Sequence, residues 1–139
     1  MAIRAGWITP ILQSPDIERS MRWWERLGFE RVDVVRDGHG TIVWARMHCE
    51  GGAIMFTPAE GALRTTPGER VPFYMYAPDL EALRARLRAD GVDPGPVSHP
   101  HYMPKGEICL TDPDGYTVLV GHWDDEDHQK WERERQSRI

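Results

Sequence analysis

The pattern of apolar and polar positions occurs twice along this chain, at an offset of 63 residues. Residues 14–18 read SPDIE and residues 77–81 read APDLE, while Gly28 corresponds to Gly91. In each copy the proline suits a first helical turn, because its missing N–H group would have no partner there. The glycine thirteen residues after that proline fits a left-handed C-terminal cap. The repeat therefore predicts two equivalent helices, one in each half.

Between these start and stop signals the apolar residues recur at helical spacing, so that each helix has one face to bury. This face consists of Ile17, Met21, Trp24 and Leu27 in the first copy and of Leu80, Leu83 and Leu87 in the second. The charged residues fall mostly on the other faces. Both helices are thus predicted to pack on one side of a sheet.

Segments rich in β-branched and aromatic residues flank each helix and indicate strands. The expected strands are 7–12, 29–35, 41–48 and 53–57 in the first half and 71–76, 92–97, 107–111 and 116–120 in the second. Turn residues separate them, and the DPDG sequence at 112–115 is a strong tight-turn signal. Each half is therefore predicted as βαβββ.

The resulting organisation is a single domain over residues 1–123. Repeat one spans 6–58, a linker spans 59–70, and repeat two spans 71–123. Residues 124–139 are highly charged and are expected to form a C-terminal helix or tail, solvated or packed on a partner.

The composition and charge of the chain exclude several classes of protein, but they do not assign a function. The chain has 139 residues and a formal net charge of -5, with its basic residues scattered, so we expect no nucleic-acid partner. No apolar run approaches the roughly 18–20 residues of a membrane span, and we see no signal peptide. Two cysteines do not indicate a disulfide framework, so a cytoplasmic location is predicted.

The doubled unit resembles a known superfamily. SPDIERSMRWWERLGF follows the first expected strand and TDPDGYTVLV lies near the end of the second half. Together with the repeat, these motifs resemble the vicinal-oxygen-chelate superfamily, which includes glyoxalase I, extradiol dioxygenases, fosfomycin-resistance enzymes and bleomycin-resistance proteins. The resemblance covers residues 6–123. It implies an α+β fold in which tandem βαβββ repeats form a curved mixed sheet around a cavity, with two such units facing each other within a chain or across a dimer interface. We expect a homodimer.

The resemblance also implies metal ligands on the first and last strands of each half. Those positions fall here on Thr9, Met55, Pro72 and Leu119. None is a plausible ligand for the metals of this superfamily, and the residues next to them do not replace them. We therefore expect no metal and no cofactor. The closest analogy is a metal-independent protein of the glyoxalase and bleomycin-resistance type that holds an amphipathic or aromatic small molecule.

Alternation along the strands predicts which side chains line the cavity, because successive residues of a strand face opposite sides. The predicted ligand-binding residues, loop residues included, are Trp7, Thr9, Trp44, Arg46, His48, Met55, Tyr74, Tyr76, Tyr102, Met103, Glu107 and Leu119. Aromatic faces favour a flat ligand and can also hold a cation. The alternative is that these aromatic side chains fill the hollow themselves as core.

The segment 99–107 is the best candidate functional loop, and the alternative is a proline-braced connection with surface histidines. It offers two catalytic candidates, His101 as an acid or base and Glu107 as a general base. Glu107 would instead be structural if it paired with Arg46. The alternative function is an enzyme of the same superfamily, a lyase, isomerase or dioxygenase, using relocated residues such as His48, His101 and Glu107. A third hypothesis is a protein that contacts a partner through its charged tail.

Overall fold

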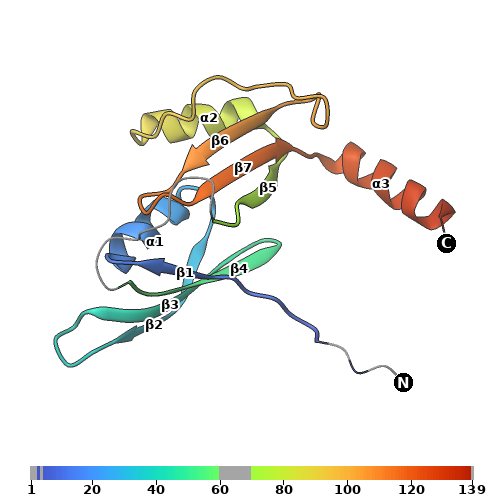
Figure 1. The fold of residues 1–139 in the computed structure, drawn as a ribbon. Coiled ribbons are helices and arrows are strands. Elements are labelled where there is room, and N and C mark those ends of the chain that lie inside the picture. Colours follow the sequence, from blue (N-terminus) through green and yellow to red (C-terminus); the bar gives the residue numbers. More distant parts are fainter. Residues whose placement is uncertain (1–2, 4, 60–69, 139) are drawn as a thin grey trace. The chain divides into compact units, whose positions relative to one another are not determined.

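The computed structural model describes residues 3, 5–59 and 70–138, which contain three helices and seven strands (Figure 1). The fold is α+β with mixed strand pairing, as the sequence predicted, and its strands form two sheets that each contain parallel and antiparallel pairs. Two compact units divide the chain. Of the described residues, the first unit comprises 3, 5–59 and 112–114, and the second comprises 70–111 and 115–138. None of the helices in the described part combines the length and hydropathy needed to cross a bilayer.

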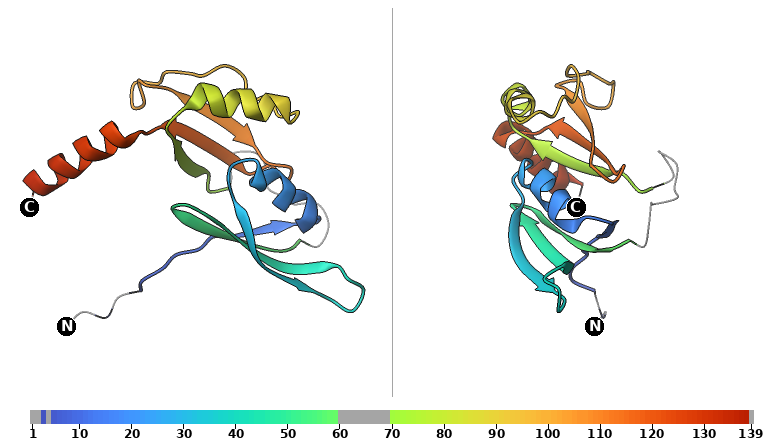
Figure 2. Two further views of the ribbon diagram at one scale, coloured as in Figure 1. Left: turned by 180° about the vertical axis from the view of Figure 1, so that it is seen from behind. Right: turned by 90° about the vertical axis from the view of Figure 1, so that its left-hand side faces the viewer.

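The first unit is a four-stranded sheet with one helix on it (Figures 1 and 2). Its strands are β1 (Ile11–Ser14), β4 (Gly52–Pro58), β3 (Ile42–Cys49) and β2 (Glu30–Arg36), in that spatial order. β1 runs parallel to β4, and the other pairs are antiparallel. Helix α1 (Ile17–Glu25) packs against β3 and β4. The largest fully buried side chains between them are those of Leu12, Met21, Trp24, Met47 and Phe56.

The second unit is a three-stranded sheet with helix α2 (Leu80–Ala89) on one face (Figure 2). Its spatial order is β5 (Phe73–Ala77), β7 (Thr117–His122) and β6 (Glu107–Thr111), with β5 parallel to β7. Helix α3 (Asp125–Ser137) follows β7 directly. It projects from the end of that strand and buries none of its described residues (Figure 1).

Both predicted helices are present and begin and end by the same local rules. The side chains of Asp16 and Asp79 accept hydrogen bonds from the backbone N–H groups of Arg19 and Ala82, at 3.0 Å in each case. These bonds satisfy N–H groups that have no partner within the helix. Past the C-terminal ends, Gly28 and Gly91 have φ angles of 93° and 82°, which other residues rarely adopt. The sequence repeat is therefore a structural repeat at both helices.

The first predicted strand, 7–12, was wrong at its N-terminal end. Residues 5–10 form no strand, and β1 starts at Ile11. Pairing begins where the carbonyl of Pro10 accepts a hydrogen bond of 3.0 Å from the N–H of Met55. Proline has no N–H to return, so residue 10 cannot continue the ladder toward the N-terminus. Trp7 is consequently outside the sheet and 75% exposed.

The strand predicted at 92–97 was also wrong. This segment contains no strand, and only an isolated bridge joins Ser98 to Glu107. Pro94 and Pro96 lack the N–H groups that alternate ladder positions require. The segment is held instead by the Arg84 side chain, whose Nε donates to the carbonyl of Gly95 at 2.6 Å. The second half is therefore βαββ rather than βαβββ.

Beneath α1, polar side chains form a buried network that the hydrophobic pattern does not predict. The hydroxyls of Ser14 and Ser20 lie 2.8 Å apart, and Ser20 donates to Asp114 at 2.6 Å. The indole N–H of Trp24 donates to Asp112 at 3.1 Å. Each of these buried groups thus has the partner that burial demands. Asp112 and Asp114 therefore stabilise the first unit, in addition to forming the turn that the sequence predicted.

Candidate functional site

Strand alternation in the second unit produces one face under α2 and one open face. Ile108, Leu110, Val118 and Val120 are buried. The residues between them occupy the open face in two rows across the sheet. One row is Tyr74, Leu119 and Cys109, and the other is Tyr76, Gly121 and Glu107. The open face thus combines aromatic rings with one carboxylate.

Glu107 is the centre of the polar contacts on this face. Its side chain is buried at 6% exposure, and it accepts hydrogen bonds from the hydroxyls of Tyr74 at 2.7 Å and Tyr102 at 3.0 Å. The second bond links β6 to the loop that precedes it. Among the described residues of the second unit, no lysine, arginine or histidine forms an ion pair with Glu107.

Both tyrosine hydroxyls hold their protons more strongly than a free phenol. Burial raises the pKa of Tyr74, and its hydrogen bond to Glu107 raises it further. The hydrogen bond to Glu107 is the main cause of the raised pKa of Tyr102. Each hydroxyl therefore remains a donor to the carboxylate at neutral pH. The ring of Tyr74 is 37% exposed even though its hydroxyl reaches a buried group.

Gly121 provides the space in which these groups meet. A Cβ atom at this position would lie 2.6 Å from the hydroxyl oxygen of Tyr74 and 2.8 Å from the methyl carbon of Met103. Gly121 also pairs with both Tyr76 and Glu107 across the sheet. The absent side chain therefore lets Tyr74 and Met103 lie over β7.

The aromatic surface extends past the end of β7. The ring centroids of Tyr74 and Tyr76 are 5.2 Å apart, and those of Tyr76 and Trp123 are 5.6 Å apart. Trp123 was not among the predicted site residues. The signal for it is the alternation of Leu119 and Gly121, which reaches residue 123 when continued past the strand.

Of the two catalytic candidates, His101 lies in the loop before β6, and Glu107 is the first residue of β6. His101 is exposed, and its ring packs against Tyr102 with centroids 5.6 Å apart. Tyr102 in turn donates to Glu107, so the structure links the two candidates through a tyrosine. His99 is held by the carbonyl of Pro104 at 2.9 Å from its Nδ1.

The remaining predicted residues belong to the first unit. Trp44, Arg46 and His48 alternate along β3 with the buried Ala45 and Met47, so they face away from α1. Met55 shares that face because it pairs with Arg46.

The guanidinium of Arg46 lies 5.6 Å from the centroid of the Trp44 ring. Its buried Nε has no hydrogen-bond partner among the described residues. Since Arg46 and Glu107 belong to different units, their pairing stays a prediction.

The four positions at which the resemblance places the superfamily's metal ligands, Thr9, Met55, Pro72 and Leu119, do not fit a metal by their chemistry. Leu119 has no donor atom, and proline has no side-chain donor either. Thr9 and Pro72 also lie outside the strands. The thioether of Met55 is a soft ligand, unsuited to the hard and intermediate metals of these enzymes. No step of a reaction can therefore be assigned to a metal at these positions.

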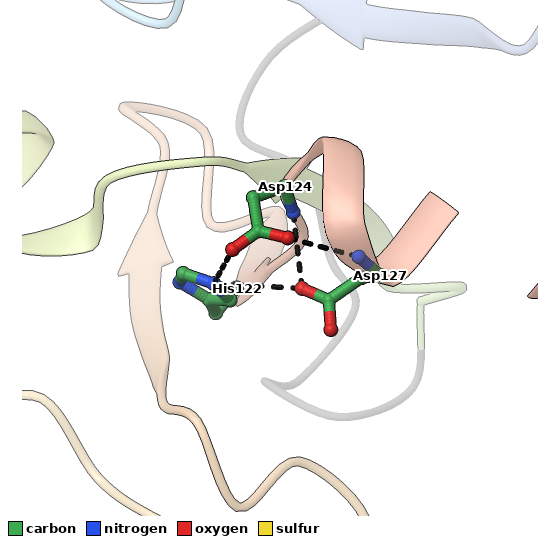
Figure 3. A group of neighbouring side chains, drawn as sticks. All are labelled: His122, Asp124 and Asp127. Atoms are coloured by element: carbon green, nitrogen blue, oxygen red, sulfur yellow. Dashed lines mark hydrogen bonds and ion pairs between the residues drawn. The ribbon is translucent and has the colours of Figure 1, made fainter. Parts of the chain in front are cut away.

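A different group of potential ligands lies where β7 meets α3 (Figure 3). His122 Nε2 is 3.0 Å from a carboxylate oxygen of Asp124 and 3.5 Å from one of Asp127. Among the described residues, these three form the group with closely spaced donor atoms, and His48, His101 and Glu107 are not in it.

Helix capping and ion pairing explain that arrangement. Asp124 and Asp127 form a reciprocal capping box at the start of α3. Lys105 forms an ion pair of 2.7 Å with Asp127. The N–H of Asp127 and the His122 ring hold the pKa of Asp124 at about 2. We interpret this group as the anchor of the helix.

A hollow of about 530 Å³ opens beside the start of α1 in the first unit. Charged side chains border it, and Arg31 contacts Glu18 at 2.8 Å and Glu25 at 2.9 Å. The hydrogen bond from Arg31 lowers the pKa of Glu18. The charges of Arg31, Glu18 and Glu25 are thus paired with one another. None of the predicted ligand-binding residues lines this hollow.

Comparison with known proteins assigns the chain to a family. It belongs to the Glyoxalase/Bleomycin resistance protein/Dioxygenase superfamily, whose family model matches residues 4–120. This agrees with the resemblance read from the repeat and the two motifs. Among curated proteins, no sequence matches this chain.

Solved structures share the fold at low sequence identity. A bleomycin-binding protein complexed with bleomycin is 19% identical, with a TM-score of 0.63, and the match covers 86% of this chain and 100% of that one. A glyoxalase-related enzyme from Clostridium phytofermentans is 15% identical, with a TM-score of 0.67 and coverage of 88% and 98%. The fosfomycin resistance protein FosX from Listeria monocytogenes, complexed with Mn(II), is 14% identical, with a TM-score of 0.64 and coverage of 91% and 99%. These likenesses establish the fold.

Proposed function

We propose that this protein binds a small amphipathic or aromatic molecule on the open face of the second-unit sheet, without a metal ion. The observation that carries the proposal is the row of aromatic rings beside a buried carboxylate. Tyr74, Tyr76 and Trp123 are in successive ring contact, and Tyr102 and Tyr74 both bond to Glu107. Ligand sites combine apolar and aromatic walls with a few fixed polar groups in this way.

The exposure of these rings supports a binding role over a core role. Tyr76 is 58% exposed and Tyr74 is 37% exposed, although both stand next to other aromatic groups. Adjacent apolar surfaces left open to water mark sites of interaction. Met103 lies against Tyr74 at the rim and has the flexible side chain that adapts to a ligand.

Metal independence is supported by the chemistry of Thr9, Met55, Pro72 and Leu119. Ligand binding is therefore expected to be unchanged by prolonged dialysis against EDTA, measured by calorimetric titration before and after. A loss of binding that one added divalent metal restores would contradict this part of the proposal.

The proposal extends to the first unit and to a second copy of the chain. Trp7, Thr9, Trp44, Arg46, His48 and Met55 are proposed as ligand-binding residues of the first unit, where Arg46 would orient a polar group of a ligand. We expect the protein to be a homodimer, in which the second copy supplies the surface that faces the ligand. We expect its location to be the cytoplasm. Light scattering on the purified protein is expected to give twice the mass of the chain. A strictly monomeric protein that still binds the ligand would remove the dimer from the proposal.

The decisive test is a thermal-shift screen of aromatic metabolites and antibiotics, followed by calorimetric titration of each hit. Tyr76→Ala is expected to weaken binding by about tenfold, the loss of one aromatic contact. Val71→Ala is the matched control, because Val71 is an exposed apolar residue just before the same strand. If no compound class stabilises the protein, or if both variants bind alike, the site is not on this face.

A further inference from the structure

The buried carboxylate of Glu107 has no cationic partner among the described residues of its own unit, and this bears on the charge of the ligand. A buried carboxylate is costly unless it is paired with positive charge or fully hydrogen bonded. Each oxygen of Glu107 receives one phenol hydroxyl, from Tyr74 and from Tyr102. A carboxylate offers about four acceptor positions, so two hydroxyls leave capacity for further donors.

The surroundings of Glu107 favour a cation over any other further donor. Tyr74 and Tyr76 present ring faces on the same side of the sheet, and such faces attract ammonium and guanidinium groups. Lys105, the nearest lysine in sequence, is paired with Asp127 instead. An anionic ligand group would meet the carboxylate as a like charge.

From this geometry we infer that the ligand is an organic cation, an amine or quaternary ammonium carried on an aromatic or apolar body. The cation lies against Glu107 and the rings of Tyr74 and Tyr76, and the body lies along the surface toward Trp123. This inference rests on the proposed function, since it names the class of ligand for the same site. It goes beyond that function because aromatic stacking alone does not determine whether the bound ligand is a cation, an anion or a neutral molecule.

The experiment compares three soluble probes of one shape on the purified full-length protein at pH 7. Phenethylammonium is the cation, 2-phenylethanol is its neutral isostere, and 3-phenylpropanoate is the anion. Calorimetric titration is expected to show the cation binding about tenfold more tightly than the alcohol, the size of one cation–π or charge-assisted contact. The anion is expected to bind most weakly.

Two variants assign that preference to Glu107. Glu107→Gln is expected to reduce the preference for the cation over the alcohol to about one, because the amide keeps the shape and loses the charge. Glu81→Gln makes the same charge change on the exposed first turn of α2 and is expected to leave the preference intact. Circular dichroism checks that both variants fold. If Glu107→Gln does not fold, the comparison of the three probes on the unmodified protein decides the outcome.

The outcomes separate the inference from the proposed function. Equal binding of the cation and the alcohol overturns the organic-cation inference and leaves aromatic binding standing. A preference that survives in Glu107→Gln overturns the role of that carboxylate. Failure of all three probes to bind or stabilise the protein overturns both the inference and the proposed function.

Discussion

The two units begin from the same helix signals and use their helices differently. Helix α1 buries Ile17, Ser20, Met21, Trp23 and Trp24, whereas α2 buries only Leu80 and Leu87. At the repeat offset of 63 residues, Met21 corresponds to Arg84. The first is fully buried, and the second is half-buried and donates to a loop carbonyl. Helices with the same start and stop signals thus differ in what they bury. Helix α1 buries several large side chains, whereas α2 uses the equivalent position for a hydrogen bond to a loop.

The two units also differ in where they place their buried polar groups. The first unit places its buried polar groups under α1, where Ser14, Ser20 and Asp114 bond to one another. The second unit places its buried carboxylate, Glu107, on the open face. The two halves therefore share their helix ends, but a buried acidic group lies on the helix side of the first unit and on the side away from the helix in the second.

The largest expected effect comes from truncating the two equivalent helix positions. Met21→Ala is expected to lower the free energy of unfolding by about 2–5 kcal/mol, since it removes a fully buried side chain. Arg84→Ala is expected to cost about 1–2 kcal/mol, since it removes one hydrogen bond from a partly solvated charged group. Urea unfolding followed by circular dichroism measures both. Equal losses would mean that the second helix is held as firmly as the first.

Gly121→Ala tests whether the second sheet is shaped for its tyrosine. The added methyl group displaces Tyr74 and Met103, so we expect a loss of about 1–3 kcal/mol together with weaker ligand binding. Gly52→Ala in β4 is the control, because a Cβ there meets only Cys49 Sγ at 3.8 Å. The same urea titration compares them. If both substitutions are silent, the space above Gly121 has no structural role.

Removal of the two N-caps tests whether the two equivalent caps contribute equally to the free energy of unfolding. Asp16→Ala and Asp79→Ala are each expected to cost about 1 kcal/mol, the usual value for a lost N-cap. Asp16→Asn and Asp79→Asn keep the acceptor and serve as controls. Thermal unfolding monitored at 222 nm compares the four variants. Two clearly unequal losses would show that packing, rather than the cap, decides how firmly each helix begins.

The smallest expected effect is a pH dependence of α3. Asp124 has its pKa lowered to about 2 from a usual value of 3.8, so its stabilising effect is present above pH 3.8 and is lost as the pH falls through 2. Helicity at 222 nm is expected to decline over that range. Asp124→Asn caps without titrating, so its decline should be smaller. An identical acid profile for both proteins would assign the loss to other carboxylates.

Local chemistry determined much of this protein from its sequence. The proline and glycine signals predicted both helices, because caps and turns depend on a few neighbouring residues. Each proline, however, lies one residue before the N-cap aspartate and not in the first helical turn. Alternation predicted the two faces of each sheet, because the side-chain period of a strand is fixed at two. The repeat and the motifs around residues 14–29 and 111–120 predicted the superfamily.

Tertiary structure decided what depends on contacts between distant segments. The network joining Ser20 to Asp114 and Trp24 to Asp112 spans 94 and 88 residues, and no periodicity contains it. The contact of Tyr74 with Glu107 needed Gly121 between them, which pairing across β5, β7 and β6 supplies. Strand ends likewise depend on whether a partner offers its N–H and C=O groups. A sequence specifies each residue's capacity for contact, but only the fold brings the partners within reach.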